Sequence, residues 1–311
     1  VFIENLHDHF IKIRCKLNIL VHNCIKFCNF ATFLLPMQKV NTAMKDKRIL
    51  YVSSEVVPYL AENEVSLMSY DVPKMINDQG GQIRIFMPRY GNINERRHQL
   101  HEVIRLSGMN LVVNDLDMPL IIKVASIPKE RIQVYFIDND EYFKRKATFA
   151  DEDGVMYPDN DERAIFFAKG VVETVKKLNW VPDIIHVHGW LASMLPVYMK
   201  HYYKNEALFS ETKIVTSVYA ESFSETLDVE MINKVKFDGV PHEAIADLEL
   251  PNYENILKTA VLNSDAVIIA SDSLSPSLTK FIESSNKPFL PFTPKDGFAE
   301  AYTNFYSNEV I

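Results

Sequence analysis

Cysteine is scarce in this sequence of 311 residues, where it occurs only at positions 15, 24 and 28. Since no cysteine follows Cys28, the rest of the chain must fold without disulfides, which indicates a reducing compartment and predicts a cytoplasmic protein. His22 lies close to Cys24 and Cys28, but a zinc site usually needs a second pair of ligands further along the chain. No second cysteine pair exists, so we predict no metal site.

An excess of positive charge is also missing. The chain has 33 Lys and Arg against 41 Asp and Glu, which gives a formal net charge of -8 at pH 7. A surface that binds nucleic acid or an anionic membrane is normally basic, so we expect neither partner. No run of about 18 apolar residues occurs, and we therefore expect no transmembrane helix.

The first 46 residues lack a clear periodicity of apolar side chains. Met44 opens the segment "MKDKRILYVSSE", which has the form of a natural start that leads into a first strand. A signal peptide needs an uninterrupted apolar run before its cleavage site, and residues 27–36 match that pattern poorly because Asn29 interrupts them. We interpret residues 1–46 as a non-native or disordered extension, and a targeting peptide is the alternative.

From residue 47 onward, short apolar runs alternate with longer helical patterns. Such alternation indicates βαβ units, and runs that are apolar on both faces are typical of strands covered by helices on both sides. The apolar runs cover 48–54, 82–88, 121–127, 132–138, 183–188, 213–219 and 266–271, and the clearest helical patterns cover 162–178, 191–204 and 254–264. A short polar connection between the third and fourth runs predicts an inserted β-hairpin. The expected fold class is α/β: a Rossmann-like open, mostly parallel sheet with helices on both faces, over residues 47–285.

The helix expected over 162–178 allows two more detailed predictions. On the helix expected over 162–178, Lys169 falls outside the apolar face and should be available to solvent. Asp159 or Asp161 could cap the start of this helix.

Residues 286–311 contain several prolines and aromatics and are too apolar for a free linker. We expect this tail to pack back on the domain, and the alternative is that it once led towards a second domain.

Glycine and lysine are absent from the turn that follows the first predicted strand. In nucleotide-binding α/β domains this turn holds phosphate groups through backbone N–H groups and positive charge. Here it contains Ala61, Glu62, Asn63 and Glu64, whose bulk and two carboxylates oppose that chemistry. The sequence also lacks a G-x-G-x-x-G or P-loop motif, because its Gly80–Gly81 pair precedes a strand, as a helix C-cap and turn do.

Ligands of open parallel sheets bind beyond the carboxyl ends of the strands, and two other groups of residues are expected there. These are His186, His188 and Trp190 in "HVHGW", and Tyr219 and Glu221 in "SVYAES". The two histidines share one face of their strand and could meet one ligand, or they could be hydrogen-bonded core residues. Trp190 could stack on a sugar, or it could close a helix against the sheet. No catalytic residue can be assigned from these patterns.

The motifs follow one another in an order that resembles a known family. "ILYVSSEVVPYL", "IRIFMPRYG", "DNDERAIFFAKGVVE", "PDIIHVHGWLAS" and "NSDAVIIASDSLSPSL" are arranged as in the starch synthase catalytic domain, the acceptor-side half of bacterial glycogen and starch synthases. The resemblance covers residues 47–281. It implies one half of a two-domain glycosyltransferase fold, with transfer of glucose from ADP-glucose to an α-1,4-glucan, retention of configuration and no metal or cofactor. An α-glucan or a nucleotide sugar is then the expected ligand.

Several positions depart from the pattern of that family. The family's opening loop, Lys-x-Gly-Gly-Leu, aligns with residues 61–65, so the contacts to the donor's phosphates are missing here. Its His-x-His-Asp-Trp-His becomes "HVHGWL" at 186–191, and the histidine of its Thr-Val-His-Asn segment aligns with a residue of the "TSVY" stretch that ends at Tyr219. Arg163 matches the arginine of the family's Asp-Asn-x-x-Arg element, and we predict a helix-packing or capping role for it.

Length is a further departure, because about 30 residues follow the last matched segment whereas a donor domain needs 100 or more. We therefore expect a diverged glucosyltransferase domain that serves α-1,4-glucan synthesis, is not self-sufficient, and acts with a separate donor-domain chain. One alternative is a catalytically inactive descendant, a pseudoenzyme that binds glucan or a partner. Another is an interaction protein that retains only the fold.

Overall fold

The computed structural model describes residues 43–220 and 223–311. Most of the predicted extension, and Glu221 among the candidate site residues, therefore lie outside the described residues. Residues 43–46, which we assigned to the extension, form a turn in which Met44 is buried against the core. No helix in the described ranges is long and apolar enough to cross a membrane.

The sheet contains all seven strands predicted from the apolar runs. They are β1 (Arg48–Ser53), β2 (Gln82–Pro88), β5 (Leu116–Ser126), β6 (Gln133–Asp138), β7 (Ile184–His188), β8 (Lys213–Val218) and β9 (Ala266–Ile269). Three short strands were not predicted, and they are β3 (His101–Glu102), β4 (Met109–Val113) and β10 (Phe289–Leu290). β3 and β10 have only two residues each, which is too short for a periodic pattern to stand out.

The strands follow the order β10-β9-β8-β7-β1-β2-β6-β5-β3, with β4 paired to β5. Pairing is parallel from β10 to β6, and it is antiparallel where β5 meets β6, β3 and β4. This topology confirms the open, mostly parallel Rossmann-like sheet and the inserted hairpin. The chain builds outward in one direction from β1 and in the other from β7, so the switch point of the sheet lies between these two strands.

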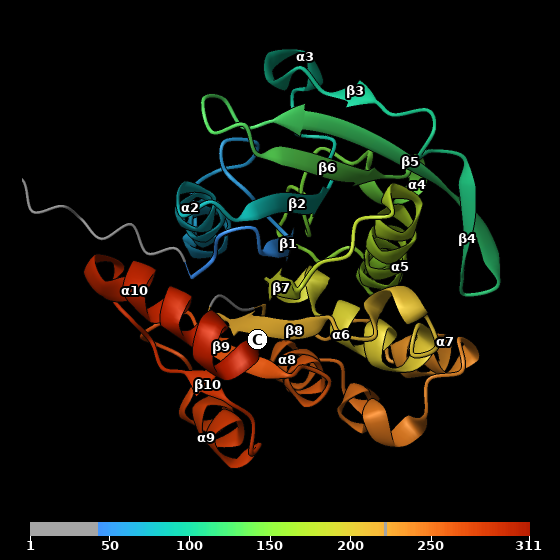
Figure 1. Ribbon diagram of the computed structural model, residues 1–311. Coiled ribbons are helices and arrows are strands. Elements are labelled where there is room, and N and C mark those ends of the chain that lie inside the picture. Colours follow the sequence, from blue (N-terminus) through green and yellow to red (C-terminus); the bar gives the residue numbers. More distant parts are fainter. Residues whose placement is uncertain (1–42, 221–222) are drawn as a thin grey trace, which may run out of the picture. The chain divides into compact units, whose positions relative to one another are not determined.

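The helices connect the strands as in other doubly wound folds. The α-helices described are α2 (Glu64–Asp78), α3 (Glu95–His98), α4 (Asp140–Phe143), α5 (Asn160–Leu178), α6 (Leu195–Val197), α7 (Met231–Phe237), α8 (Tyr253–Leu262), α9 (Pro276–Ser284) and α10 (Lys295–Phe305). Figure 1 shows α2 and α10 on one side of the central strands, with α5 and α6 on the other. The helix predicted over 191–204 is instead α6 between a 3₁₀ turn and a π turn, with Pro196 near its first residue. Proline lacks the N–H that a continuous helix would need there.

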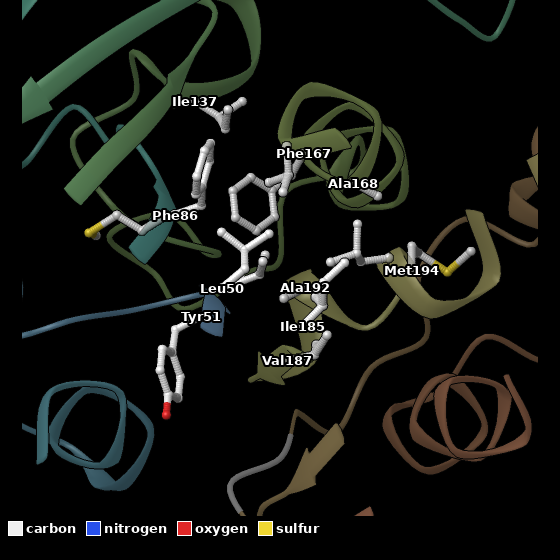
Figure 2. Close-up of a cluster of buried hydrophobic side chains, with 14 of the residues drawn as sticks. Leu50, Tyr51, Phe86, Ile137, Phe167, Ala168, Ile185, Val187, Ala192 and Met194 are labelled. Atoms are coloured by element: carbon white, nitrogen blue, oxygen red, sulfur yellow. The ribbon is translucent and has the colours of Figure 1, made fainter. Parts of the chain in front are cut away.

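The two faces of the central strands carry different cores. Leu50 of β1 and Ile185 of β7 point towards Phe167 of α5, whereas Tyr51 points to the opposite face (Figure 2). All four side chains are fully buried. Because side chains alternate along a strand, His186 and His188 lie on the Tyr51 face, away from α5.

Two predictions for helix α5 are wrong, namely the exposure of Lys169 and the capping by Asp159 or Asp161. The Lys169 side chain is 3% exposed, and its Nζ lies 2.6 Å from Asp238 Oδ1 and 2.7 Å from the Val112 carbonyl oxygen. The expected solvent face is covered, because α7 and the residues after it pack against this helix. Neither aspartate caps the helix, since the carboxylate of Asp159 binds Arg145 and that of Asp161 pairs with Lys234 at 2.7 Å.

Residues from 286 onward add β10 to the edge of the sheet and place α10 against α2. Lys295 Nζ lies 2.7 Å from Asp71 Oδ2, and Gln79 Nε2 donates to Thr303 Oγ1 at 3.0 Å. Tyr302 and Tyr306 of this segment are buried. The tail therefore packs on the domain, and its aromatic side chains complete the core on the face of the sheet that carries Tyr51.

Candidate functional site

A cavity of about 270 Å³ opens at the switch point of the sheet, beyond the carboxyl ends of β1 and β7. Ser54 and Glu55 follow β1 into its wall, and Gly189 and Trp190 follow β7. Thr148 and Phe149, from the loop before α5, and Phe223 and Tyr253 complete much of the lining. This is the place where ligands of open α/β sheets bind, and the mixture of aromatic walls with a few polar groups is typical of small-molecule sites.

Four aromatic rings form a continuous series along this cavity, which we call the aromatic row. Ring centroids are 4.9 Å apart between Phe149 and Trp190, 5.2 Å between Trp190 and Phe223, and 5.4 Å between Phe223 and Tyr253. The Trp190 side chain is 7% exposed, whereas the other three are half-buried. The row therefore offers ring edges and faces to a ligand without leaving a large apolar surface in water.

Gly189 is required for this arrangement. Its φ of +77° lies in the left-handed region, which side chains rarely adopt. A Cβ at this position would lie 2.5 Å from Ser54 Oγ, the atom that accepts a hydrogen bond from Leu191 N at 3.1 Å. The glycine thus lets the end of β7 approach the end of β1 and directs the chain into Trp190.

A second cavity, of about 520 Å³, adjoins the first and shares Phe223 and Tyr253 with it. The N-terminal turns of α8 and α9 contribute most of its polar groups, among them Asn252, Asn255, Lys258, Ser273 and Ser275. Asn252 Oδ1 accepts from Asn255 N at 2.9 Å, and Ser275 Oγ accepts from Leu278 N at 3.2 Å, so both helices are capped by their own chain.

The opening turn is closed by its own side chains. Asn63 Oδ1 accepts from Ser66 N at 2.7 Å, and Asn63 N donates to Ser66 Oγ at 2.9 Å, which is a complete capping box. Asn63 Nδ2 also donates to Glu55 Oε2 at 2.7 Å, and Ser271 Oγ donates to the Glu64 carboxylate. The N-terminus of α2, where a phosphate would bind in other proteins, is therefore occupied by carboxylate and amide groups of this chain. Ala61 and Glu62 face outward, beside a separate cavity of about 480 Å³.

His186 and His188 are fully buried beneath this edge of the sheet. His186 Nδ1 is hydrogen-bonded to the Tyr306 hydroxyl at 2.6 Å, and its Nε2 to Ser217 Oγ at 2.8 Å. His188 Nδ1 is hydrogen-bonded to the Tyr219 hydroxyl at 2.6 Å. Burial lowers the pKa of His188 to about 3, and burial together with the neighbouring His188 lowers the pKa of His186 well below its usual range. Both rings are therefore neutral at pH 7.

Arg163 does not line the first cavity but holds one of its walls in place. The side chain is fully buried, with Nη1 donating to Asn160 Oδ1 at 2.5 Å and Nη2 to the Thr148 carbonyl oxygen at 2.7 Å. Its guanidinium carbon also lies 5.1 Å from the centre of the Phe143 ring. Arg163 thus fixes the loop that carries Thr148 and Phe149, which is a packing role like the one we predicted.

The structure brings the predicted site residues together only in part. Trp190 lines the first cavity and Tyr219 the second, whereas His186 and His188 line neither and have partners inside the protein. Sequence reasoning missed Glu55, which could have been found because it follows β1 at the carboxyl edge. It also missed Phe149, Phe223 and Tyr253, which stand in no recognisable motif.

Comparisons with known proteins agree with the topology. The profile of the starch synthase catalytic domain matches residues 48–282. A glycogen synthase from Chlorobium phaeobacteroides is 33% identical over 242 residues, which are 76% of this chain and 48% of the relative. One from Chlorobium limicola is 39% identical over 178 residues, which are 57% of this chain and 36% of the relative. The chain thus spans about half or less of the length of these curated relatives.

Among solved structures, the catalytic domain of starch synthase IV from Arabidopsis thaliana, bound to ADP and acarbose, superimposes with a TM-score of 0.65. The match covers 82% of this chain and 53% of that one, at 15% sequence identity. At this identity the likeness bears on the fold alone. It supports a Rossmann-like domain of the glycosyltransferase type.

Proposed function

Since this chain belongs to the starch synthase catalytic domain family, we propose that it serves α-glucan synthesis from ADP-glucose as a glucan-binding domain that does not transfer glucose on its own. The observation that carries this proposal is the contrast between two neighbouring features. The cavity at the switch point is open and aromatic, whereas the N-terminus of α2 beside it is closed by the protein's own polar groups.

The first cavity suits a neutral sugar. Aromatic rings such as Trp190 and Phe149 present large apolar surfaces, against which the C–H faces of a glucose ring can pack. Glu55, Ser54 and Thr148 line the same cavity. Such groups accept or donate hydrogen bonds to sugar hydroxyls and would fix the orientation of the ligand.

A nucleotide diphosphate would meet unfavourable chemistry at the opening turn. Two like charges 4 Å apart repel each other by roughly 1 kcal/mol in water and by roughly 4 kcal/mol near a protein surface. Glu55 and Glu64 each lie next to the start of α2, and Asn63 already accepts from the backbone N–H of Ser66. We therefore propose that the contacts to the donor's phosphates come from outside this turn, for which a separate donor-binding chain is one source.

Electrophoresis of the purified protein in gels that contain glycogen tests glucan binding. We expect wild type to be retarded and Trp190→Ala to migrate as in a gel without glycogen. Trp180→Ala is the matched control, because Trp180 precedes β7 and Trp190 follows it, at opposite ends of that strand. Phe149→Ala serves as a second variant if Trp190→Ala fails to fold. Unchanged migration of wild type in glycogen would contradict the proposal.

Incubation of the protein with ADP-glucose and glycogen tests the second part of the proposal. We expect no incorporation of glucose by this chain alone, and incorporation after a donor-binding partner is added. Transfer by the chain alone would contradict the proposed division of labour. A catalytically inactive, glucan-binding descendant is the alternative, and it is supported by Tyr219, which stands in the segment where the family has a histidine and is hydrogen-bonded to His188. That alternative predicts no transfer even with the partner present.

A further inference from the structure

Three arginines lie together near the amino-terminal ends of the central strands, at the opposite end of the sheet from the aromatic row. Arg48 is the first residue of β1, and Arg84 is the third residue of β2. Because Leu50 is in register with Arg84 and side chains alternate along a strand, Arg48 and Arg84 lie on the face of the sheet that carries Leu50. Arg105, in the turn after β3, is close enough to Arg84 to lower its pKa. We call these three residues the arginine cluster.

The guanidinium group of Arg84 lies against two aromatic rings. Its central carbon is 4.7 Å from the centre of the Trp180 ring and 5.6 Å from that of the Tyr135 ring. Both rings are buried, and Tyr135 is also stacked on Phe86, with 4.8 Å between the ring centroids. Aromatic faces attract a cation but are poor acceptors for its N–H groups. The rings therefore fix the position of the guanidinium group and leave its hydrogen-bonding capacity unused.

The arginine cluster has no anionic partner among the residues that the structure describes. Arg84 Nη1 is buried without a hydrogen-bond partner, and none of the three guanidinium groups forms an ion pair or a side-chain hydrogen bond in the described ranges. The carboxylate of Asp183 accepts from the backbone N–H of Arg48 at 2.8 Å, so it supports the backbone of β1. Buried donors are normally paired, and the chain as a whole is acidic. The cluster thus has the form of a site that lacks its acceptor.

Repulsion within the cluster is a second observation that favours an anion. Burial lowers the pKa of Arg84, and Arg48 and Arg105 lower it further, so these neighbours disfavour its charged form. Helix α5 ends two residues before Trp180 and has a partial negative charge at that end, but two lysines already lie in its last turn. A bound anion would offset the repulsion and accept hydrogen bonds from the guanidinium groups.

We propose that the arginine cluster binds a small anion that carries one or more phosphate groups, with Trp180 and Tyr135 holding Arg84 in position. A planar guanidinium group can donate two parallel hydrogen bonds to one phosphate, and three such groups favour a ligand with more than one negative charge. The site lies at the other end of the strands from the aromatic row, so the inference goes beyond glucan binding and does not depend on it. Occupation of the site stabilises the folded domain by mass action.

Isothermal titration with inorganic pyrophosphate, at constant ionic strength, tests this inference. We expect wild type to bind with a dissociation constant below about 1 mM. Arg84→Gln removes the charge and should raise the dissociation constant by about tenfold or more, because a hydrogen bond to a charged group contributes about 1.5–3 kcal/mol. Arg105→Gln should raise it in the same direction, and this exposed position in a turn provides a second variant if Arg84→Gln fails to fold.

The matched control is Arg96→Gln, which removes the same charge from an exposed position on α3, beyond the carboxyl end of β2. It should bind pyrophosphate as wild type does. Absence of binding to wild type would overturn the inference, and so would an affinity that neither Arg84→Gln nor Arg105→Gln reduces. An equal loss of affinity in Arg96→Gln would also overturn it, because binding would then depend on net charge and not on the arginine cluster.

Discussion

Lys169 is a lysine whose charge is almost completely withdrawn from water. Its ammonium group lies against Asp238, the Val112 carbonyl oxygen and the face of the Tyr202 ring, whose centroid is 4.9 Å away. The Tyr198 hydroxyl donates to the other Asp238 oxygen at 2.6 Å. Withdrawing two charges from water is costly, and the hydrogen bonds of both partners offset this cost.

Replacing Lys169 by methionine should therefore lower the free energy of unfolding by about 3–5 kcal/mol, because Asp238 is left buried without its cation. Lys177→Met, at an exposed position near the end of the same helix, should change it by less than about 0.5 kcal/mol. Urea denaturation of both variants makes the comparison. The double variant Lys169→Met/Asp238→Asn should lose less than Lys169→Met alone, and a double variant that loses as much as the two single losses added together would argue against charge burial as the cause.

At the scale of the element, α2 shows how a helix can begin without a ligand at its N-terminus. Asn63→Ala removes the side-chain oxygen that accepts from Ser66 N and should cost about 1 kcal/mol of the free energy of unfolding. Asn63→Gly should cost only a few tenths of that, about 0.3 kcal/mol, because glycine is itself a good N-cap. Thermal unfolding at one pH distinguishes the two variants. Equal losses would show that Asn63 acts through its contact with Glu55 and not as a cap.

Some helices and strands could be predicted from the sequence, and others could not. Strands buried on both faces are continuous apolar runs, which is why the seven strands that contain such runs were found. Helices α7 and α10 were missed because their positions depend on packing against parts of the chain that are distant in sequence, such as α5 for α7 and α2 for α10. At the site, Trp190 was found from its place after β7, whereas Phe149 and Phe223 come from loops. Their side chains reach the cavity only through contacts such as that of Arg163 with Thr148, which no local pattern encodes.

At the scale of the whole molecule, buried ionisable groups make stability depend on pH. His186 and His188 have pKa values lowered by burial, so below pH 6.5 the unfolded chain binds protons that the folded chain does not. Stability contributed by the neutral rings is therefore lost as pH falls. Burial raises the pKa of Asp161 to about 6, which acts in the opposite direction between pH 6 and 3.8. Burial also raises the pKa of Asp138, which acts in the same direction as Asp161.

Comparing His188→Asn with wild type isolates one of these contributions, because Asp161 is common to both proteins. Asparagine can replace His188 Nδ1 in the hydrogen bond with Tyr219 but does not titrate. Between pH 7.5 and 5.0 the variant should lose about 2 kcal/mol less of its free energy of unfolding than wild type does. His101→Asn, at an exposed position on β3, should show the same loss as wild type. Parallel pH profiles for His188→Asn and wild type would contradict the assignment.

The first turn of α2 obtains its hydrogen bonds from Asn63 and Ser66, two residues of the same turn. When a helix N-terminus binds an anion, the bound anion stabilises the folded state by mass action. The melting temperature of such a protein then rises with the concentration of the anion. Here Asn63 and Ser66 already form the capping box in the free protein. At this turn the stability of the fold should therefore not depend on the concentration of a bound anion.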